Sequence, residues 1–109
     1  MALLGHYAQH WVNDQGNPAG GVSTGRGFTI SWQNGPLGPP HSQDRREPNG
    51  AFVEDVIQAV IGRLEHFQES RFNCAENASA LQYLSMAAQV LDERTKDRET
   101  RQVEGTYAF

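Results

Sequence analysis

Two stretches in the second half of the chain carry apolar residues at steps of three and four positions, and a short link joins them. In the first stretch these positions are Phe52, Val53, Val56, Ile57, Val60, Ile61, Leu64 and Phe67, and in the second they are Leu81, Leu84, Ala88 and Leu91. Such spacing places side chains on one face of an α-helix. Because only a few residues separate the two helices, we expect them to be antiparallel, as a helical hairpin over about residues 51–102.

Local signals predict where these helices begin and end. Asn49 or Gly50 should open the first helix, which should run to about Gln68. The second helix should start within residues 73–76, where Asn73 has the spacing of a capping residue to Glu76.

The first half of the chain has a different character, because it holds most of the eleven glycines and all five prolines. Residues 16–27 are rich in Gly and Asn-Pro signals, which predict turns. Residues 28–32 alternate apolar and polar side chains, which is typical of a strand with one buried face. The prolines that follow favour a loop over residues 35–50. We therefore expect a small sheet.

Composition narrows the class of protein. A chain of 109 residues with 38% hydrophobic residues fits one domain whose core is thin or shared with another copy. A single cysteine excludes an internal disulfide and suggests a reducing compartment. No apolar run approaches the ~20 residues needed to cross a bilayer, and the first residues do not resemble a signal peptide. A net charge of -4 argues against duplex nucleic-acid binding.

Three arginines near the end of the second predicted helix form the first candidate site. Arg94, Arg98 and Arg101 recur at i, i+4 and i+7, which would project them from one side of the helix. Guanidinium groups bind phosphate oxygens through paired hydrogen bonds, so the row is a candidate phosphate clamp. The alternative is a solvated helix end, where cations interact favourably with the helix dipole and neighbouring carboxylates.

Asn77 and Phe67 form a second candidate site near the bend between the helices. Asn77 lies in line with Leu84, Leu91 and Arg98, where an amide can read a base edge, fix helix register or serve the helix cap. Phe67, like Phe72 and Trp32, could stack on a nucleobase or belong to the core.

Other chemical groups do not form a site in the sequence. His6 and His10 lack a third metal ligand, and Cys74 lacks a histidine partner. No pair of carboxylates stands out as a general acid and base, and the glycine cluster matches no nucleotide-binding loop. The residues therefore predict no catalytic site, no metal and no cofactor.

Several motifs together resemble a known family. They are Ile30 to Pro36, Val56-Ile57, Arg63-Leu64, Phe67-Gln68, residues 72–77 and residues 94–106. This pattern is similar to the phage-encoded Thoeris anti-defence proteins of the first type, the sponges that sequester nucleotide immune signals. The resemblance covers roughly residues 27–106, and its most specific part is the run from Arg94 to Thr106.

The resemblance implies an α+β protomer with a small N-terminal antiparallel sheet followed by a two-helix antiparallel hairpin. It implies a single sponge domain over residues 27–109, with a strand region at 27–50, after a variable N-terminal extension of residues 1–26. It further implies homodimers, or hexamers built as trimers of dimers. Members bind glycocyclic ADP-ribose, and some also bind cyclic di- or trinucleotides, without cleaving them. The place of action would be the cytoplasm of the infected bacterium.

Carried over by motif position, the resemblance assigns a role to four residues. Phe67 would stack on a base, Asn77 would hydrogen-bond that base, and Arg94 and Arg98 would hold the phosphates. Gln102 stands where the family pattern has glycine, which could alter how the chain leaves the helix. The loop over residues 36–49 diverges from the family, so Arg45 and Arg46 receive no role.

Helix geometry then predicts a site shared between chains. Asn77 and Arg94 are seventeen positions apart, or about 25 Å at 1.5 Å rise per residue, too far for one small ligand. Two hairpins arranged head to toe would bring the bend of one chain to the arginines of the other, twice about a two-fold axis. The alternatives are a hairpin that only oligomerises or docks on a host protein and, with less support, an enzyme acting on a nucleotide.

Overall fold

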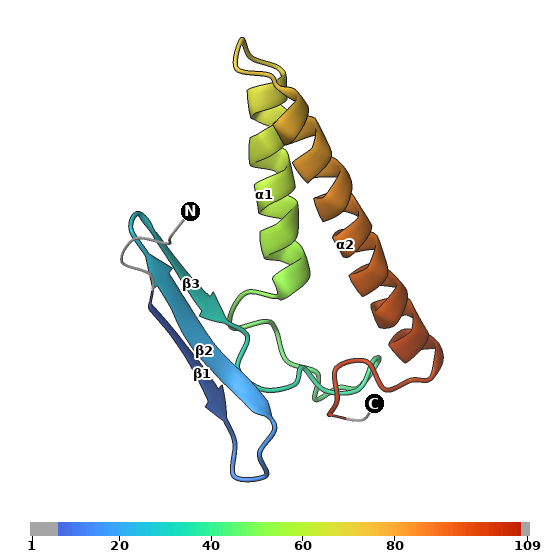
Figure 1. Cartoon of the computed structure of the whole chain (residues 1–109). Coiled ribbons are helices and arrows are strands. Elements are labelled where there is room, and N and C mark those ends of the chain that lie inside the picture. The colour runs from blue at the N-terminus through green and yellow to red at the C-terminus, as the bar shows by residue number, and fades with distance from the viewer. Residues whose placement is uncertain (1–6, 108–109) are drawn as a thin grey trace. The chain divides into compact units, whose positions relative to one another are not determined.

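The computed structural model describes residues 7–107 and contains three strands followed by two helices. The strands are β1 (Tyr7–Val12), β2 (Pro18–Gly25) and β3 (Phe28–Trp32), and the helices are α1 (Val53–Gln68) and α2 (Ala75–Thr100) (Figure 1). The strands form one antiparallel sheet in the order β1-β2-β3. The predicted α+β class, with a small antiparallel sheet preceding a helical hairpin, is therefore confirmed.

The chain divides into two units. One contains the sheet, the loop that follows it and the segment from Glu99 onward, and the other contains residues 53–98. The predicted boundary between residues 26 and 27 falls in the turn between β2 and β3, where Gly25 pairs with Phe28.

The prediction that residues 16–27 form turns is wrong, because Pro18–Gly25 is the central strand β2. Two of its glycines allow atoms of the neighbouring strands to approach the β2 backbone closely. A Cβ on Gly21, whose φ is +145°, would collide with the carbonyl oxygen of Gln9, and one on Gly25 would collide with the Phe28 ring. Glycine is frequent both in turns and in strands that another chain segment approaches closely. Local composition therefore does not distinguish a turn from a strand here.

One face of the sheet is organised around Ser23, which is the most buried polar residue described. Its cross-strand partners are Ala8 and Ile30, and its Oγ accepts a hydrogen bond from the indole Nε1 of Trp32 at 2.9 Å. The strand predicted at residues 28–32 is confirmed as β3.

The predicted loop over residues 35–50 contains no helix or strand, and Asn49 closes it. The Asn49 Oδ1 accepts from the backbone N–H of Asn34 at 2.8 Å, and its own N–H donates to the Gln33 Oε1 at 2.8 Å. Next, Ala51 forms a parallel bridge with Trp32. Because this bridge holds residue 51 extended, the first helix begins at Val53 rather than at Asn49 or Gly50.

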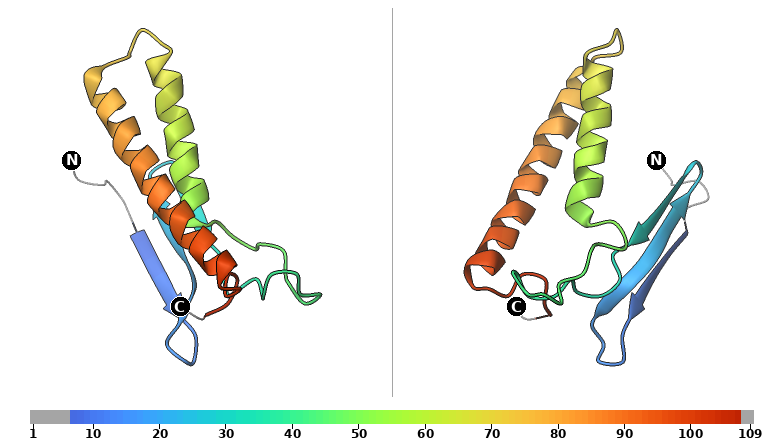
Figure 2. Two further views of the ribbon diagram at one scale, coloured as in Figure 1. Left: turned by 90° about the vertical axis from the view of Figure 1, so that its right-hand side faces the viewer. Right: turned by 180° about the vertical axis from the view of Figure 1, so that it is seen from behind.

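The two helices form an antiparallel hairpin, as predicted, and their chain reverses at residues 69–74 (Figure 2). Besides Ala80, the half-buried residues of α2 recur with alternating steps of four and three: Asn77, Leu81, Leu84, Ala88, Leu91, Thr95 and Arg98. On α1, Ile57, Ile61 and Leu64 are half-buried. This spacing matches the inner seam of a helix pair.

No hydrophobic side chain among residues 7–107 is buried. Several large ones are exposed on the helices: Val53, Val60 and Phe67 on α1, and Tyr83, Met86 and Val90 on α2. Within one chain the core is therefore thin, which fits the expectation of a core that is thin or shared with another copy. Neither helix has the length and apolarity that crossing a bilayer requires.

Candidate functional site

The bend of the hairpin carries two of the four predicted site residues. Phe67 lies in the last turn of α1 and Asn77 in the first turn of α2. Gln68 connects the two helix ends, because its Nε2 donates to the Cys74 carbonyl and its Oε1 accepts from the Cys74 N–H, both at 3.0 Å. The Ser70 N–H donates to the Phe67 carbonyl at 3.0 Å. These bonds hold together the two helix ends that carry Phe67 and Asn77.

Cys74, and not Asn73, caps the second helix. The Cys74 carbonyl accepts from the Ala78 N–H at 3.2 Å, and its Sγ accepts from the Asn77 N–H at 3.4 Å, which is the N-cap pattern. The Asn73 side chain instead donates to the Ser70 carbonyl at 2.8 Å. The Asn73 side chain, which the sequence suggested as the helix cap, thus stabilises the turn instead. The cap of α2 therefore lies one residue later, at Cys74.

Phe67 presents a ring that is 37% exposed and already has a cationic neighbour. The Arg63 guanidinium lies 5.1 Å from its centroid, and the His66 ring centroid lies at 6.2 Å. One turn of helix separates Arg63 from Phe67, so this contact is local. The ring is not enclosed in the hairpin seam, and it keeps accessible surface for stacking.

The other two aromatic candidates have different surroundings. Phe72 is 62% exposed in the bend and lies under the Arg71 guanidinium at 4.8 Å. Trp32 is half-buried, and its indole N–H donates to Ser23. Trp32 therefore has a structural role in the sheet.

Asn77 is half-buried at the first position of the α2 seam. Its backbone N–H belongs to the helix cap, so the cap does not require its side-chain amide. The predicted alignment with Leu84, Leu91 and Arg98 is confirmed by their shared half-buried positions.

The arginine row is shorter than predicted. Arg94 and Arg98 lie on α2, whereas Arg101 lies in the turn after its last residue, Thr100. Arg94 is exposed and Arg98 is half-buried in line with the seam. Gln102 then adopts a φ of +61°, and its N–H donates to the Glu99 carbonyl at 3.0 Å. This left-handed residue after a helix is the position at which glycine is favoured, so the chain leaves α2 in a glycine-like conformation despite the glutamine.

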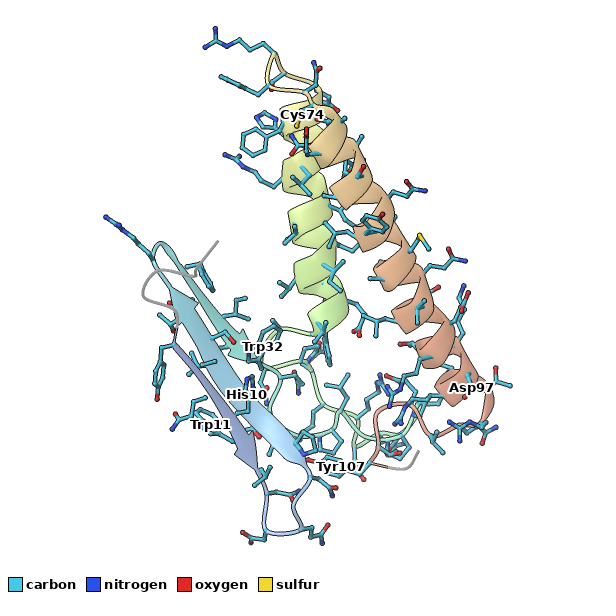
Figure 3. The ribbon with its side chains drawn as sticks, viewed as in Figure 1. His10, Trp11, Trp32, Cys74, Asp97 and Tyr107 are labelled. Atoms are coloured by element: carbon cyan, nitrogen blue, oxygen red, sulfur yellow. The ribbon has the colours of Figure 1, made fainter. Side chains whose placement is uncertain are left out.

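The two halves of the candidate site lie at opposite ends of one continuous helix. In Figure 3, Cys74 marks the start of α2 and Asp97 lies near its other end. Asn77 and Arg94 are thus about 25 Å apart along the axis, as expected from 1.5 Å rise per residue. One hairpin does not bring them together.

A depression of about 400 Å³ lies between the helices, away from these four residues. It is lined by Glu54, Gln58 and Ile61 of α1 and by Ser85, Ala88, Gln89 and Asp92 of α2. Its two carboxylates and absence of lysine or arginine do not suit an anionic ligand. Asp92 also pairs with Lys96 at 3.0 Å.

Arg45, which received no role from the sequence, makes a bidentate ion pair with Glu104. It donates two hydrogen bonds to the Glu104 carboxylate, at 2.8 and 2.9 Å. Hydrogen bonding to Glu104, opposed by desolvation, raises the pKa of Arg45 above its ordinary value. Neighbouring Arg46 donates to the Pro36 carbonyl at 2.8 Å. No sequence signal links partners 59 positions apart.

Three or more metal-ligating side chains do not cluster anywhere in residues 7–107. Cys74 is exposed and its Sγ serves the helix cap. His6, one of the two histidines considered above, lies outside the described residues.

The fold and the candidate residues define a class: α+β proteins in which a helical hairpin follows a small antiparallel sheet. The family model described as Acb2/Tad1, hairpin domain, matches residues 28–96, which include β3, α1 and most of α2. The chain belongs to this family.

A protein of Bacillus phage SBSphiJ7, named "Thoeris anti-defense 1", is 43% identical over 83 residues. The match covers 76% of this chain and 54% of that protein, so the chain spans about half the length of the curated relative it matches. The resemblance stated from the sequence motifs is confirmed.

Proposed function

We propose that this protein is a phage-encoded, non-catalytic sponge that counters Thoeris-type immunity in the cytoplasm of the host bacterium. It binds glycocyclic ADP-ribose signals without cleaving them, and cyclic di- or trinucleotides are further candidate ligands. Membership in the hairpin family and similarity to a protein named for Thoeris anti-defence support the biological role. Four residues carry the binding: Phe67, Asn77, Arg94 and Arg98.

The observation that carries the site proposal is the uninterrupted helix α2, from Ala75 to Thr100. It presents Asn77 at the end that follows the bend, and Arg94 and Arg98 near the other end, while the partly exposed Phe67 lies in the last turn of α1 before the bend. A base and a phosphate of one small ligand span much less than the ~25 Å between these ends. Two chains therefore build each site, with Phe67 and Asn77 from one protomer and Arg94 and Arg98 from its partner.

The surface of the hairpin supports assembly into such dimers. On α1, Val53, Val60 and Phe67 are spaced by seven residues, and each is at least 37% exposed. On α2, Tyr83, Met86 and Val90 form a second exposed apolar stripe. Because residues 7–107 bury no hydrophobic side chain within one chain, covering such stripes in a dimer would add apolar burial that the single chain lacks. We propose a homodimer, which can assemble further into a hexamer as a trimer of dimers.

Thermal unfolding with glycocyclic ADP-ribose tests the proposal. Ligand at ~1,000 times Kd should add about 4 kcal/mol to the free energy of unfolding, and the ligand released by heating should be chemically intact. Arg94→Ala should abolish this stabilisation, because it removes a guanidinium that holds a phosphate in the proposed site. Arg94 is exposed, so its removal should leave the hairpin folded. Lys96→Ala is the matched control, since it removes a cation from the same helix. Recovery of a cleaved product would contradict a sponge.

The alternative function is a hairpin that only oligomerises or docks on a host polypeptide. The exposed Tyr83, Met86 and Val90 stripe favours it, since apolar stripes of this kind mark protein contacts. It predicts no thermal response to any nucleotide signal, together with co-purification of a stoichiometric polypeptide. A ligand response that Arg94→Ala removes would exclude it as the sole function.

A further inference from the structure

The segment that follows α2 is joined to the loop after β3 by a set of contacts that we call the clasp: Gly38, Arg45, Glu104 and Gly105. The Arg45 guanidinium donates to both carboxylate oxygens of Glu104, at 2.8 and 2.9 Å. Its Nη1 also donates to the Gly38 carbonyl at 2.9 Å, and the Gly38 N–H donates to the Gly105 carbonyl at 2.8 Å. Three of these hydrogen bonds connect two segments that are far apart in the sequence, and the Arg45–Gly38 bond lies within the loop.

The residue types of the clasp are each required by its geometry. A planar guanidinium matches a carboxylate through two parallel hydrogen bonds, which lysine cannot make. Both side chains are half-buried, at 30% and 21% exposure, so salt screens this pair less than a surface pair. Gly105 has a φ of +78°, and a Cβ there would collide with the Gly38 carbonyl oxygen.

A short segment with local hydrogen bonds lies between the end of α2 and the clasp. The Gln102 N–H donates to the Glu99 carbonyl at 3.0 Å, and the Thr106 N–H donates to the Val103 carbonyl at 3.1 Å. Arg98 is only six residues before Glu104 and lies in the last turn of the helix, where helices fray. A restraint on Glu104 would therefore act on the turn that carries Arg98 before it acts on Arg94, which lies one turn further inside.

We propose that Arg45 and Glu104 are positioning residues for Arg98: the clasp keeps the last turn of α2 ordered, so that Arg98 is preorganised to hold a ligand phosphate. This inference rests on the proposed function. A preorganised side chain binds more tightly because its ordering cost is met before the ligand arrives. Arg45, whose guanidinium is already paired with Glu104, acts through Arg98 and does not contact the ligand.

Hydrogen exchange of the full-length protein without ligand tests the structural half. Glu104→Ala should accelerate exchange of the amides of residues 98–102 at least tenfold, and leave the amides of residues 81–91 unchanged. The charge exchange Arg45→Glu with Glu104→Arg should restore part of the protection, because it keeps the guanidinium–carboxylate pair but loses the bond to the Gly38 carbonyl. Arg26→Ala, in the exposed turn between β2 and β3, is the control. Unchanged exchange in Glu104→Ala would overturn the proposal. If Glu104→Ala does not fold, Glu104→Gln is measured in its place.

Titration with glycocyclic ADP-ribose tests the functional half. Glu104→Ala should raise Kd roughly tenfold, the effect of ordering one or two side chains, and the charge exchange should recover part of this loss. In double-mutant cycles, Arg45→Ala should be non-additive with Arg98→Ala but additive with Arg94→Ala. Faster exchange with unchanged Kd would reduce the clasp to a purely structural role and overturn the proposal. If the unmodified protein binds no ligand, the proposed function fails, while the exchange experiment still decides whether the clasp orders the helix end.

Discussion

The side chain of Gln68 makes two hydrogen bonds with the backbone of Cys74, one as donor and one as acceptor, both at 3.0 Å. Gln68 is the last residue of α1 and Cys74 is the cap of α2, so one amide connects the two helix ends. Phe67 directly precedes Gln68, and the Asn77 N–H donates to the Cys74 Sγ at 3.4 Å. The bend that carries half of the candidate site is thus held by a side chain with both a donor and an acceptor.

Replacing Gln68 should loosen this bend. Gln68→Ala removes both hydrogen bonds and should lower the free energy of unfolding by about 1 kcal/mol. Gln68→Glu keeps the acceptor but places a carboxylate oxygen against the Cys74 carbonyl, so it should be destabilising as well. Urea unfolding followed by circular dichroism measures the change. The exposed Gln82→Ala on α2 is the control, and an equal loss there would show that the bend bonds contribute little.

The helix cap predicts a stabilising substitution. A thiol sulfur is a weak acceptor, and the Cys74 Sγ accepts from the Asn77 N–H at 3.4 Å. Cys74→Ser substitutes a stronger acceptor and should raise the free energy of unfolding by about 0.5–1 kcal/mol, whereas Cys74→Ala should lower or leave it unchanged. Thermal melting of the two variants provides the comparison. A serine variant no more stable than the alanine variant would mean that residue 74 is not the effective cap.

Gln102 should be replaceable by glycine with a gain in stability. Its φ of +61° costs a residue with a Cβ about 1 kcal/mol or more, which glycine avoids. Glycine also loses more backbone freedom on folding, so the net gain should be about 0.5 kcal/mol. Chemical denaturation of Gln102→Gly against Gln102→Ala measures it, because alanine keeps the strain. Equal stability of the two variants would contradict a left-handed residue 102.

Gly105 should tolerate a side chain much less well than Gly27. Both have positive φ, +78° and +89°, but only Gly105 has atoms where a Cβ would lie: the Gly38 carbonyl oxygen and the Arg45 Nη1. Gly27→Ala should cost about 1 kcal/mol from backbone strain alone. Gly105→Ala should cost about 1–2 kcal/mol more, because the clasp must open or shift. Equal melting temperatures for the two variants would argue against the close contact between residues 38 and 105.

The hairpin could be predicted because its determinants are local. Apolar residues at steps of three and four set the faces of both helices, and the end of α1 at Gln68 followed from the loss of that pattern. Residues 28–32 were recognisable as a strand from alternation alone. The capping residue was displaced by one position, since Asn73 hydrogen-bonds within the turn and Cys74 remains for the cap.

What the sequence by itself determined was therefore each element whose pattern repeats within a few residues: the hairpin with its inner seam, and the strand β3. Tertiary structure alone decided that the glycine-rich stretch is the central strand. Its glycines are needed because Gln9 and Phe28 on the neighbouring strands leave no room for a Cβ at Gly21 and Gly25. Tertiary structure also decided the pairing of Arg45 with Glu104, because hydrogen bonds between distant segments depend on how the chain returns on itself. Periodicity records which side of an element is apolar, but it holds no information about which distant partner that side will meet.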